Sequence, residues 1–467
     1  MTAAAACFRI VVSLLAIASA LALARVAATT GLRVPLDPNE GWNAYHALHA
    51  MSGAALYPPA GSLTFNNYPP LSFYIVGAAG RLTGDFIMAG RMVSLLAVLA
   101  IAGEIYVSCR LMNTDRWSAL FPAVLFVAGL LLFSDYAGMD DPQLLAHAIA
   151  LAGLAILLRW PRDAWAIVAA ALLLVLAAFA KHNLVALPVA LAAWLLLQRR
   201  PSALLFVASG LSFAVAGLAA FRLLYGSDLF AHLNSPRLYT FAGLVASLSS
   251  WLLWCGIALA GMVLLAILRA RDRHVRLCAL YSLTALSEGI LFAGGGGVDI
   301  NIWFDAAIAL SLGAGLLLRD LGTSGKRRAL AGLAYCLPLL AGLWLQWNPD
   351  WTTRRYWLHP LEDDAAAASA DIAYLTARRG PALCEDLALC YWAGKDEEAD
   401  VFNLGQAYAS RARDAGALAG LVERRRFAVM QFDSLDPFAL GAQTKSAVLR
   451  AYRVDRTSDN GVFLVPR

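Results

Sequence analysis

Charged residues are scarce in this chain. Asp, Glu, Lys and Arg together make up 15% of its 467 residues, whereas 60% of the residues are hydrophobic, and the mean hydropathy is +0.63. This balance excludes an ordinary soluble globular protein of this length. It predicts a mainly α fold, namely a polytopic bundle of transmembrane helices.

Cysteine pairs with metal-binding or redox spacing are absent. No Cys-x-x-Cys occurs, and five of the seven cysteines fall in or beside apolar segments, where cysteine behaves as a small hydrophobic residue. Cys384 and Cys390 lie together in a polar region, where a disulfide would form in an oxidising compartment. On one strand they would share a face but stand too far apart to bond, so the sequence leaves this pairing open.

The sequence also lacks a phosphate-binding loop, because no Gly-Lys-Ser/Thr follows the glycine run at 294–297. That run predicts a turn between helices. The formal net charge is +5. Basic residues of membrane proteins collect in cytoplasmic loops, so we exclude nucleic acid as a partner.

Eleven apolar segments approach the length needed to cross a bilayer, roughly 17 to 25 residues. The first resembles a signal peptide, but the spans behind it favour a retained anchor. The segments are residues 8–28, 88–110, 117–134, 142–158, 164–180, 183–197, 203–224, 247–268, 276–293, 300–318 and 329–346.

The positions of lysine and arginine predict the orientation of these spans. If Arg9 lies in the cytoplasm, the alternation of the spans puts the later basic clusters there as well. This agreement predicts a cytoplasmic N-terminus. Acidic residues then gather on the opposite, outer face, where an ionisable group at a helix end is costly and more often functional. The outer face receives residues 29–87, 135–141, the turn around 181, residues 225–246 and 294–299, and the tail from 346.

The polar parts of the chain predict further elements. In the first outer loop, 29–87, residues 40–52 and 69–83 have the pattern of short helices at the membrane surface. After about 347 the composition becomes that of a soluble α/β domain. We therefore predict a membrane domain, 1–346, and an extracytoplasmic domain, 347–467, with helices at 363–379 and 415–425 and strands at 382–392, 427–432 and 461–465.

Several motifs in the membrane domain occur in a recognisable order. They are Gly53-Ala-Ala-Leu-Tyr57, Tyr68-Pro-Pro-Leu-Ser-Phe-Tyr74, Leu82-Thr-Gly84, Gly90-Arg-Met-Val-Ser94, Met139-Asp-Asp-Pro142, Ala180-Lys-His-Asn183 and Asp299-Ile-Asn-Ile-Trp-Phe-Asp305. This order resembles the GT-C class of membrane glycosyltransferases, in particular the bacterial protein-mannosyltransferase, aminoarabinose-transferase and RgtA/B/C/D-like group. The resemblance covers residues 1 to about 320.

The resemblance implies an enzyme of the bacterial inner membrane, in contact with membrane lipids. Such enzymes take a sugar from a polyprenyl-phosphate donor and pass it with inversion to an envelope glycan, lipid or protein on the periplasmic face. The alternatives are a transporter or flippase of lipid-linked sugars, which would predict internal repeats and charges at mid-membrane depth, and an inactive scaffold.

Inverting transfer needs a carboxylate that accepts the acceptor's proton. Asp37 and Glu40 are the candidates for this base, although the family usually carries adjacent Asp and Glu, and the separation leaves open which acts. Both also suit structural roles, Asp37 as a helix N-cap and Glu40 in the first turn. The resemblance places Asp140 and Asp141 near the acceptor or base, but beside a proline they would equally cap the next span.

The carrier phosphate needs cations or hydrogen-bond donors. Lys181 is the sole lysine before residue 326 and suits a lipid phosphate, together with His182 and Asn183; the alternative is a lysine that snorkels to the interface. Arg91 and Arg237 are weaker candidates for the same anion.

Other outer residues complete the expected substrate contacts, namely Tyr45, His46, Tyr68 and Asn301. His46 and His49 have a spacing that metals accept, but without a further matched ligand set a hydrogen-bonding role is favoured. The one cofactor left open is a divalent cation held by Asp37, Glu40 and an aspartate from 140–141.

Overall fold

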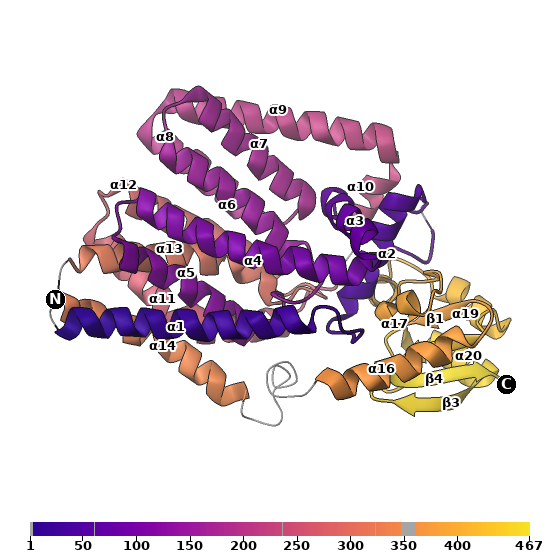
Figure 1. Cartoon of the computed structure of the whole chain (residues 1–467). Helices are drawn as coiled ribbons and strands as arrows, with labels where there is room; N and C mark the ends of the chain where they lie inside the picture. Colours follow the sequence, from indigo (N-terminus) through magenta and orange to yellow (C-terminus); the bar gives the residue numbers. More distant parts are fainter. Residues whose placement is uncertain (1–2, 60, 236, 323, 347–360) are drawn as a thin grey trace.

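A computed structural model describes the chain except residues 1–2, 60, 236, 323 and 347–360. Figure 1 shows a bundle of helices with a smaller domain of helices and strands at one end, beside the short helices of the first loop. The predicted domain boundary at 346/347 adjoins 347–360 and so falls outside the described residues. The division into two domains stays a prediction.

Each of the eleven predicted apolar segments contains a helix. These helices are α1 (Ala3–Thr29), α4 (Phe86–Leu111), α5 (Arg116–Phe133), α6 (Gln143–Arg159), α7 (Ala164–Ala180), α8 (Ala186–Gln198), α9 (Arg200–Tyr225), α11 (Phe241–Leu268), α12 (Arg273–Phe292), α13 (Phe304–Asp320), which the 3-10 turn η1 (Ile300–Trp303) precedes, and α14 (Gly325–Gln346). Within the described residues, seven helices, α1, α4, α5, α9, α11, α12 and η1–α13, are long and apolar enough to cross a membrane. Three shorter apolar helices, α6 to α8, accompany them, so the count of eleven spans stays a prediction.

Both helices predicted in the first loop are present, as α2 (Pro38–Ser52) and α3 (Leu71–Thr83). Asp37 begins α2 as its N-cap, because its carboxylate accepts the Asn39 N–H, and Gly53 ends it in the left-handed region at φ 77°. Residues 40–47 of α2 are buried. A Cβ on Gly41 would lie 2.1 Å from the backbone nitrogen of Ala388, so glycine allows α2 to pack closely on the C-terminal domain.

The C-terminal domain is built on a four-stranded mixed sheet in the order β1-β2-β4-β3, with β1 parallel to β2 and the other neighbours antiparallel. Apolar side chains from the sheet and helices form two clusters, and Phe65 of the first loop is buried in the larger one. Its elements are α16 (Leu361–Thr376), β1 (Ala382–Cys384), α17 (Leu387–Trp392), α18 (Val401–Ala409), α19 (Gly416–Glu423), β2 (Val429–Phe432), α20 (Gly441–Ala451), β3 (Tyr452–Ser458) and β4 (Gly461–Pro466).

The predicted strand at 382–392 is wrong beyond Cys384. Asp386 accepts the backbone N–H of Ala388 at 3.0 Å and so begins the helix α17. The helix brings the Cα of Cys390 to 6.0 Å from that of Cys384, and the two form a disulfide. The argument that one strand would keep them apart therefore does not apply.

Candidate active site

Two cavities meet at Asp37, the one described residue that lines both. The first, of about 190 Å³, lies between the first loop and the C-terminal domain, and its wall includes Tyr68, Arg237 and Asp400. The second, of about 350 Å³, lies between the ends of α5 and α11 and the turn before α13, and its wall includes Asp135 and Asp299. A group on Asp37 can therefore face two different ligands.

The carboxylate of Asp37 is half-buried and only partly engaged. Oδ1 accepts the Asn39 N–H at 2.8 Å, and within the described residues no other hydrogen bond reaches this carboxylate. Burial raises the pKa of Asp37 to about 7; the Asn39 hydrogen bond acts the other way, and the neighbouring charges of Glu40, Asp141 and Asp299 raise it further. A carboxyl with a pKa near neutrality is suited to accept a proton.

Glu40 is in the opposite situation, because it has no exposed surface. Arg91 donates to it from Nε at 2.7 Å and from Nη2 at 2.6 Å, and the backbone N–H groups of Leu36 and Asp140 donate at 3.1 Å each. The Arg91 guanidinium also donates to the carbonyls of Leu32 and Val34. The pair holds the strand-like entry to α2 against α4, and its geometry gives no support to Glu40 as the base or Arg91 as an anion ligand.

Asp140 and Asp141 lie in the turn before α6, and both are buried outside the two cavities. Asp140 Oδ2 has no partner among the described residues, and burial, together with the charges of Glu40 and Asp141, raises the pKa of Asp140 well above its ordinary value. Asp141 accepts the backbone N–H of Gln143 at 2.7 Å and pairs with Lys181 at 3.3 Å. The contacts of Asp141 thus tie the start of α6 to the end of α7, and neither acid lines either cavity.

Lys181 follows the last residue of α7 and is 4% exposed. Its Nζ lies 3.6 Å from the centroid of the Tyr68 ring, and Tyr68 lines the first cavity. The Lys181 ammonium group therefore lies behind the Tyr68 ring, which forms part of the cavity wall. The exposed His182 lies beside the same ring, at 6.3 Å between centroids, and Asn183 Oδ1 is buried with no partner among the described residues.

Arg237 lines the first cavity directly. Its guanidinium donates to the Gly296 carbonyl at 3.3 Å and lies 5.3 Å from the ring of Phe402 in the C-terminal domain. Asn301 is not among the lining residues of either cavity and donates to Gln143 Oε1 at 3.2 Å. Of the predicted site residues, the cavities thus bring together Asp37, Tyr68 and Arg237.

Tyr45 and His46 face the interior of the protein. The Tyr45 hydroxyl donates to the Lys395 carbonyl at 2.6 Å, which joins α2 to the C-terminal domain. His46 Nε2 lies 2.8 Å from the Phe65 carbonyl, and burial lowers the pKa of His46 to about 3, so the ring is neutral and donates to that carbonyl. Neither is among the lining residues of the two cavities described above, and both connect α2 to neighbouring segments.

Four acidic residues of the cavities were not among the predicted site residues, namely Asp135, Asp299, Glu385 and Asp400. Asp135 and Asp299 lie in the outer loops of the predicted topology, so the sequence carried a signal for them. Glu385 and Asp400 come from the C-terminal domain, and only the tertiary fold brings them to the cavity. Asp400 accepts the Trp42 indole N–H at 3.0 Å, which ties that domain to α2.

Within the described part of the chain, no group of three or more His, Cys, Asp or Glu side chains is arranged to hold a metal ion. The predicted divalent cation would also need Glu40, and both oxygens of Glu40 are engaged by Arg91. The residues present therefore do not fit the predicted ligand set.

The bundle, the buried first loop and the small mixed domain that closes over it define a polytopic GT-C fold. Solved structures with this fold include ArnT from Cupriavidus metallidurans in the apo state, at a TM-score of 0.63 and 17% identity over 95% of this chain and 96% of that one. ArnT bound to undecaprenyl phosphate gives the same values. The oligosaccharyltransferase of Archaeoglobus fulgidus in complex with Zn and sulfate matches more weakly, at a TM-score of 0.46 and 12% identity over 85% of this chain and 64% of that one. No known family model and no curated protein matches the sequence. The fold that the motifs predicted is confirmed.

Proposed function

We propose that this protein is a glycosyltransferase that transfers a sugar, with inversion, from a polyprenyl-phosphate donor to an acceptor hydroxyl at the periplasmic face. The observation that carries the proposal is the position of Asp37, a carboxylate with a pKa near 7 between two cavities. The GT-C fold supports it, and so does the ArnT structure that contains undecaprenyl phosphate.

In this mechanism the oxygen of the acceptor hydroxyl attacks the anomeric carbon of the sugar, and the Asp37 carboxylate accepts the proton of that hydroxyl. The bond from that carbon to the carrier phosphate breaks, and the phosphate oxygen keeps the electron pair. The reaction needs the base and the phosphate on opposite sides of the sugar. A residue that lines two cavities meets this requirement if each holds one substrate.

The charges of the two cavities suggest which substrate each holds. The first contains the acids Glu385 and Asp400 but also Arg237, with Lys181 behind Tyr68, and these cations suit the carrier phosphate, whose negative charge grows as the bond breaks. The second contains Asp135 and Asp299 and, among its described lining residues, no lysine or arginine, so it accepts hydrogen bonds from hydroxyls but offers a phosphate no counter-charge. We therefore place the acceptor in the second cavity.

The test is mass spectrometry of envelope glycolipids and glycans from cells with and without the gene, complemented by wild type, Asp37→Asn or Asp459→Asn. Asp459 is an exposed acid of the β3–β4 turn and lines neither cavity, so its variant controls for the lost charge. We expect a sugar-sized mass increment that requires the gene, disappears with Asp37→Asn and remains with Asp459→Asn. An unchanged profile with well-expressed Asp37→Asn would refute the proposal.

A further inference from the structure

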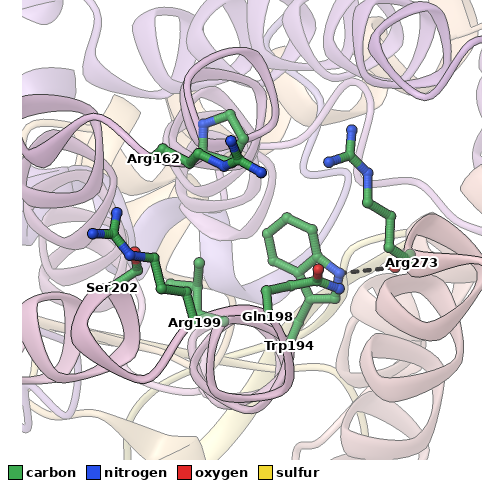
Figure 2. A pocket seen from close by; sticks show the side chains of 8 residues that line it. Arg162, Trp194, Gln198, Arg199, Ser202 and Arg273 are labelled. Carbon is green, nitrogen blue, oxygen red and sulfur yellow. Dashed lines mark hydrogen bonds between the residues drawn. The ribbon is translucent and has the colours of Figure 1, made fainter.

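A basic pocket of about 430 Å³ lies at the other end of the bundle, away from both cavities. Figure 2 shows three arginines, Arg162, Arg199 and Arg273, around Trp194 and Gln198. The wall is completed by Pro161, Leu195 and Ser202. None of these residues lines the two cavities of the candidate active site.

The pocket and the candidate active site lie at opposite ends of α7. Pro161 and Arg162 precede α7, whereas Lys181 follows it, and 17 residues of helix separate the two ends. At a rise of 1.5 Å per residue that distance is about 25 Å. Arg199 and Arg273 lie at the same end, where α9 and α12 begin.

The charges of the pocket are not neutralised by the protein. Other arginines at this end are paired with acids: Arg269 with Asp320 at 2.8 Å, and Arg319 with Asp272 at 2.7 Å. Within the described residues, neither Arg162, Arg199 nor Arg273 forms an ion pair with a carboxylate. Arg273 Nε donates to His274 Nε2 at 3.0 Å, which adds no negative charge. Three guanidinium groups without a carboxylate partner around one hollow favour an anion that carries several oxygens.

The wall between the arginines is rigid. Trp194 is 2% exposed, and its indole N–H donates to the Arg273 carbonyl at 2.8 Å, as the dashed line in Figure 2 shows. Ser202 in the first turn of α9 is also buried. The pocket is therefore a preformed hollow with buried groups in its wall and exposed basic side chains at its rim.

Exposed apolar residues on both sides of the pocket indicate the kind of molecule that carries the anion. Leu196, Leu197 and Leu204 flank the lining residues on α8 and α9 and are 55%, 57% and 69% exposed. Trp160 and Trp165 flank Arg162 and are exposed as well. Exposed tryptophans mark the depth of lipid headgroups, and exposed leucines of a bundle contact acyl chains.

We propose that this pocket binds the headgroup phosphate of an anionic phospholipid, whose acyl chains lie along α8 and α9. Basic pockets between transmembrane helices are suited to such headgroups. The bound lipid links the ends of α7, α9 and α12 and stabilises the bundle opposite the active site. This site is independent of the proposed transfer reaction.

The test is native mass spectrometry of the purified full-length protein with added cardiolipin, phosphatidylglycerol or phosphatidylcholine. The pocket variant carries Arg162→Gln, Arg199→Gln and Arg273→Gln. The matched control carries Arg110→Gln, Arg116→Gln and Arg327→Gln, three exposed arginines outside the pocket. We expect anionic lipids to bind in preference to phosphatidylcholine, about a hundredfold more weakly in the pocket variant and unchanged in the control.

Folding of each variant is checked by circular dichroism and gel filtration, and Arg199→Gln alone, with an expected loss of about fivefold, serves if the triple variant does not fold. Equal binding of phosphatidylcholine, or full anionic-lipid binding by a folded pocket variant, would overturn the proposal. Glycerol phosphate or inorganic phosphate that binds as tightly as the lipid would overturn the lipid assignment and leave a soluble phosphate site.

Discussion

Asp37 and Glu40, two acids one helical turn apart, have very different surroundings in this molecule. Asp37 is half-buried, has one hydrogen bond and lines two cavities. Glu40 is fully buried, and both its oxygens are engaged by Arg91 and two backbone N–H groups. The difference teaches that two acids of one helical turn can differ in how much of their hydrogen-bonding capacity the protein fills, and the proposed base is the acid whose capacity is largely unused.

The comparison is tested most strongly by Asp37→Asn. Asparagine is an equally good helix N-cap, so we expect stability to change by less than about 0.5 kcal/mol. Loss of the base should lower kcat by roughly 10²–10⁴-fold. The measurements are transfer of labelled sugar by purified protein and the midpoint of thermal unfolding, with Asp459→Asn as the control. A destabilised protein would instead make Asp37 a structural residue.

Glu40→Gln should give the reverse pattern. It leaves the buried Arg91 guanidinium without its counter-charge, which costs about 3–5 kcal/mol of unfolding free energy. Arg91→Gln should cost a similar amount, and the double variant much less than the sum, because the two residues act as one unit. Thermal unfolding of the four proteins measures this coupling. Additive losses would mean that the pair is not the stabilising feature.

The buried pair of Lys181 with Asp141 extends the comparison to the first cavity, where we propose that the carrier phosphate binds. Lys181→Met leaves Asp141 buried without a counter-charge, and we expect a loss of about 3 kcal/mol. Adding Asp141→Asn should restore most of the stability but not the transfer activity, because the cation behind Tyr68 is still missing. Full activity in a stable double variant would limit Lys181 to a structural role.

The pH dependence sharpens the assignment of the base. Because the pKa of Asp37 is raised to about 7, this carboxyl is protonated and inactive below that pH and ionised above it. We expect kcat/KM to fall about tenfold per pH unit below pH 7. The residual activity of Asp37→Asn should lack this dependence. The same acidic limb in that variant would assign the titration to another group.

Much of the fold could be predicted from the sequence, because hydrophobic runs and turn residues act locally. The apolar helices, the helices α2 and α3 and the strands β2 and β4 follow from such patterns, but the pairing of the two strands does not. The strand predicted at 382–392 failed because Asp386 caps a helix that apolar content alone does not distinguish from a strand. β3, α18 and α20 gave too weak a pattern to be predicted.

The candidate site was predicted less well, for a physical reason. The sequence placed the candidate acids and Lys181 on the predicted outer face but could not indicate which partner each side chain finds. Arg91 reaches Glu40 across 51 positions of sequence, and Trp42 reaches Asp400 across 358. Those distant partners pair Glu40 with Arg91 in the interior and bring the C-terminal domain to the first cavity.

Chemical rescue of Asp37→Ala tests the central claim most directly, because a small carboxylate can occupy the space left by the missing side chain and accept the acceptor's proton. The measurement is the rate of sugar transfer by the purified variant with and without formate. We predict a rate at least about a hundredfold below wild type, in line with loss of a general base, and a rise with formate that Asp459→Asn does not show. Wild-type turnover by Asp37→Ala without formate would contradict the account.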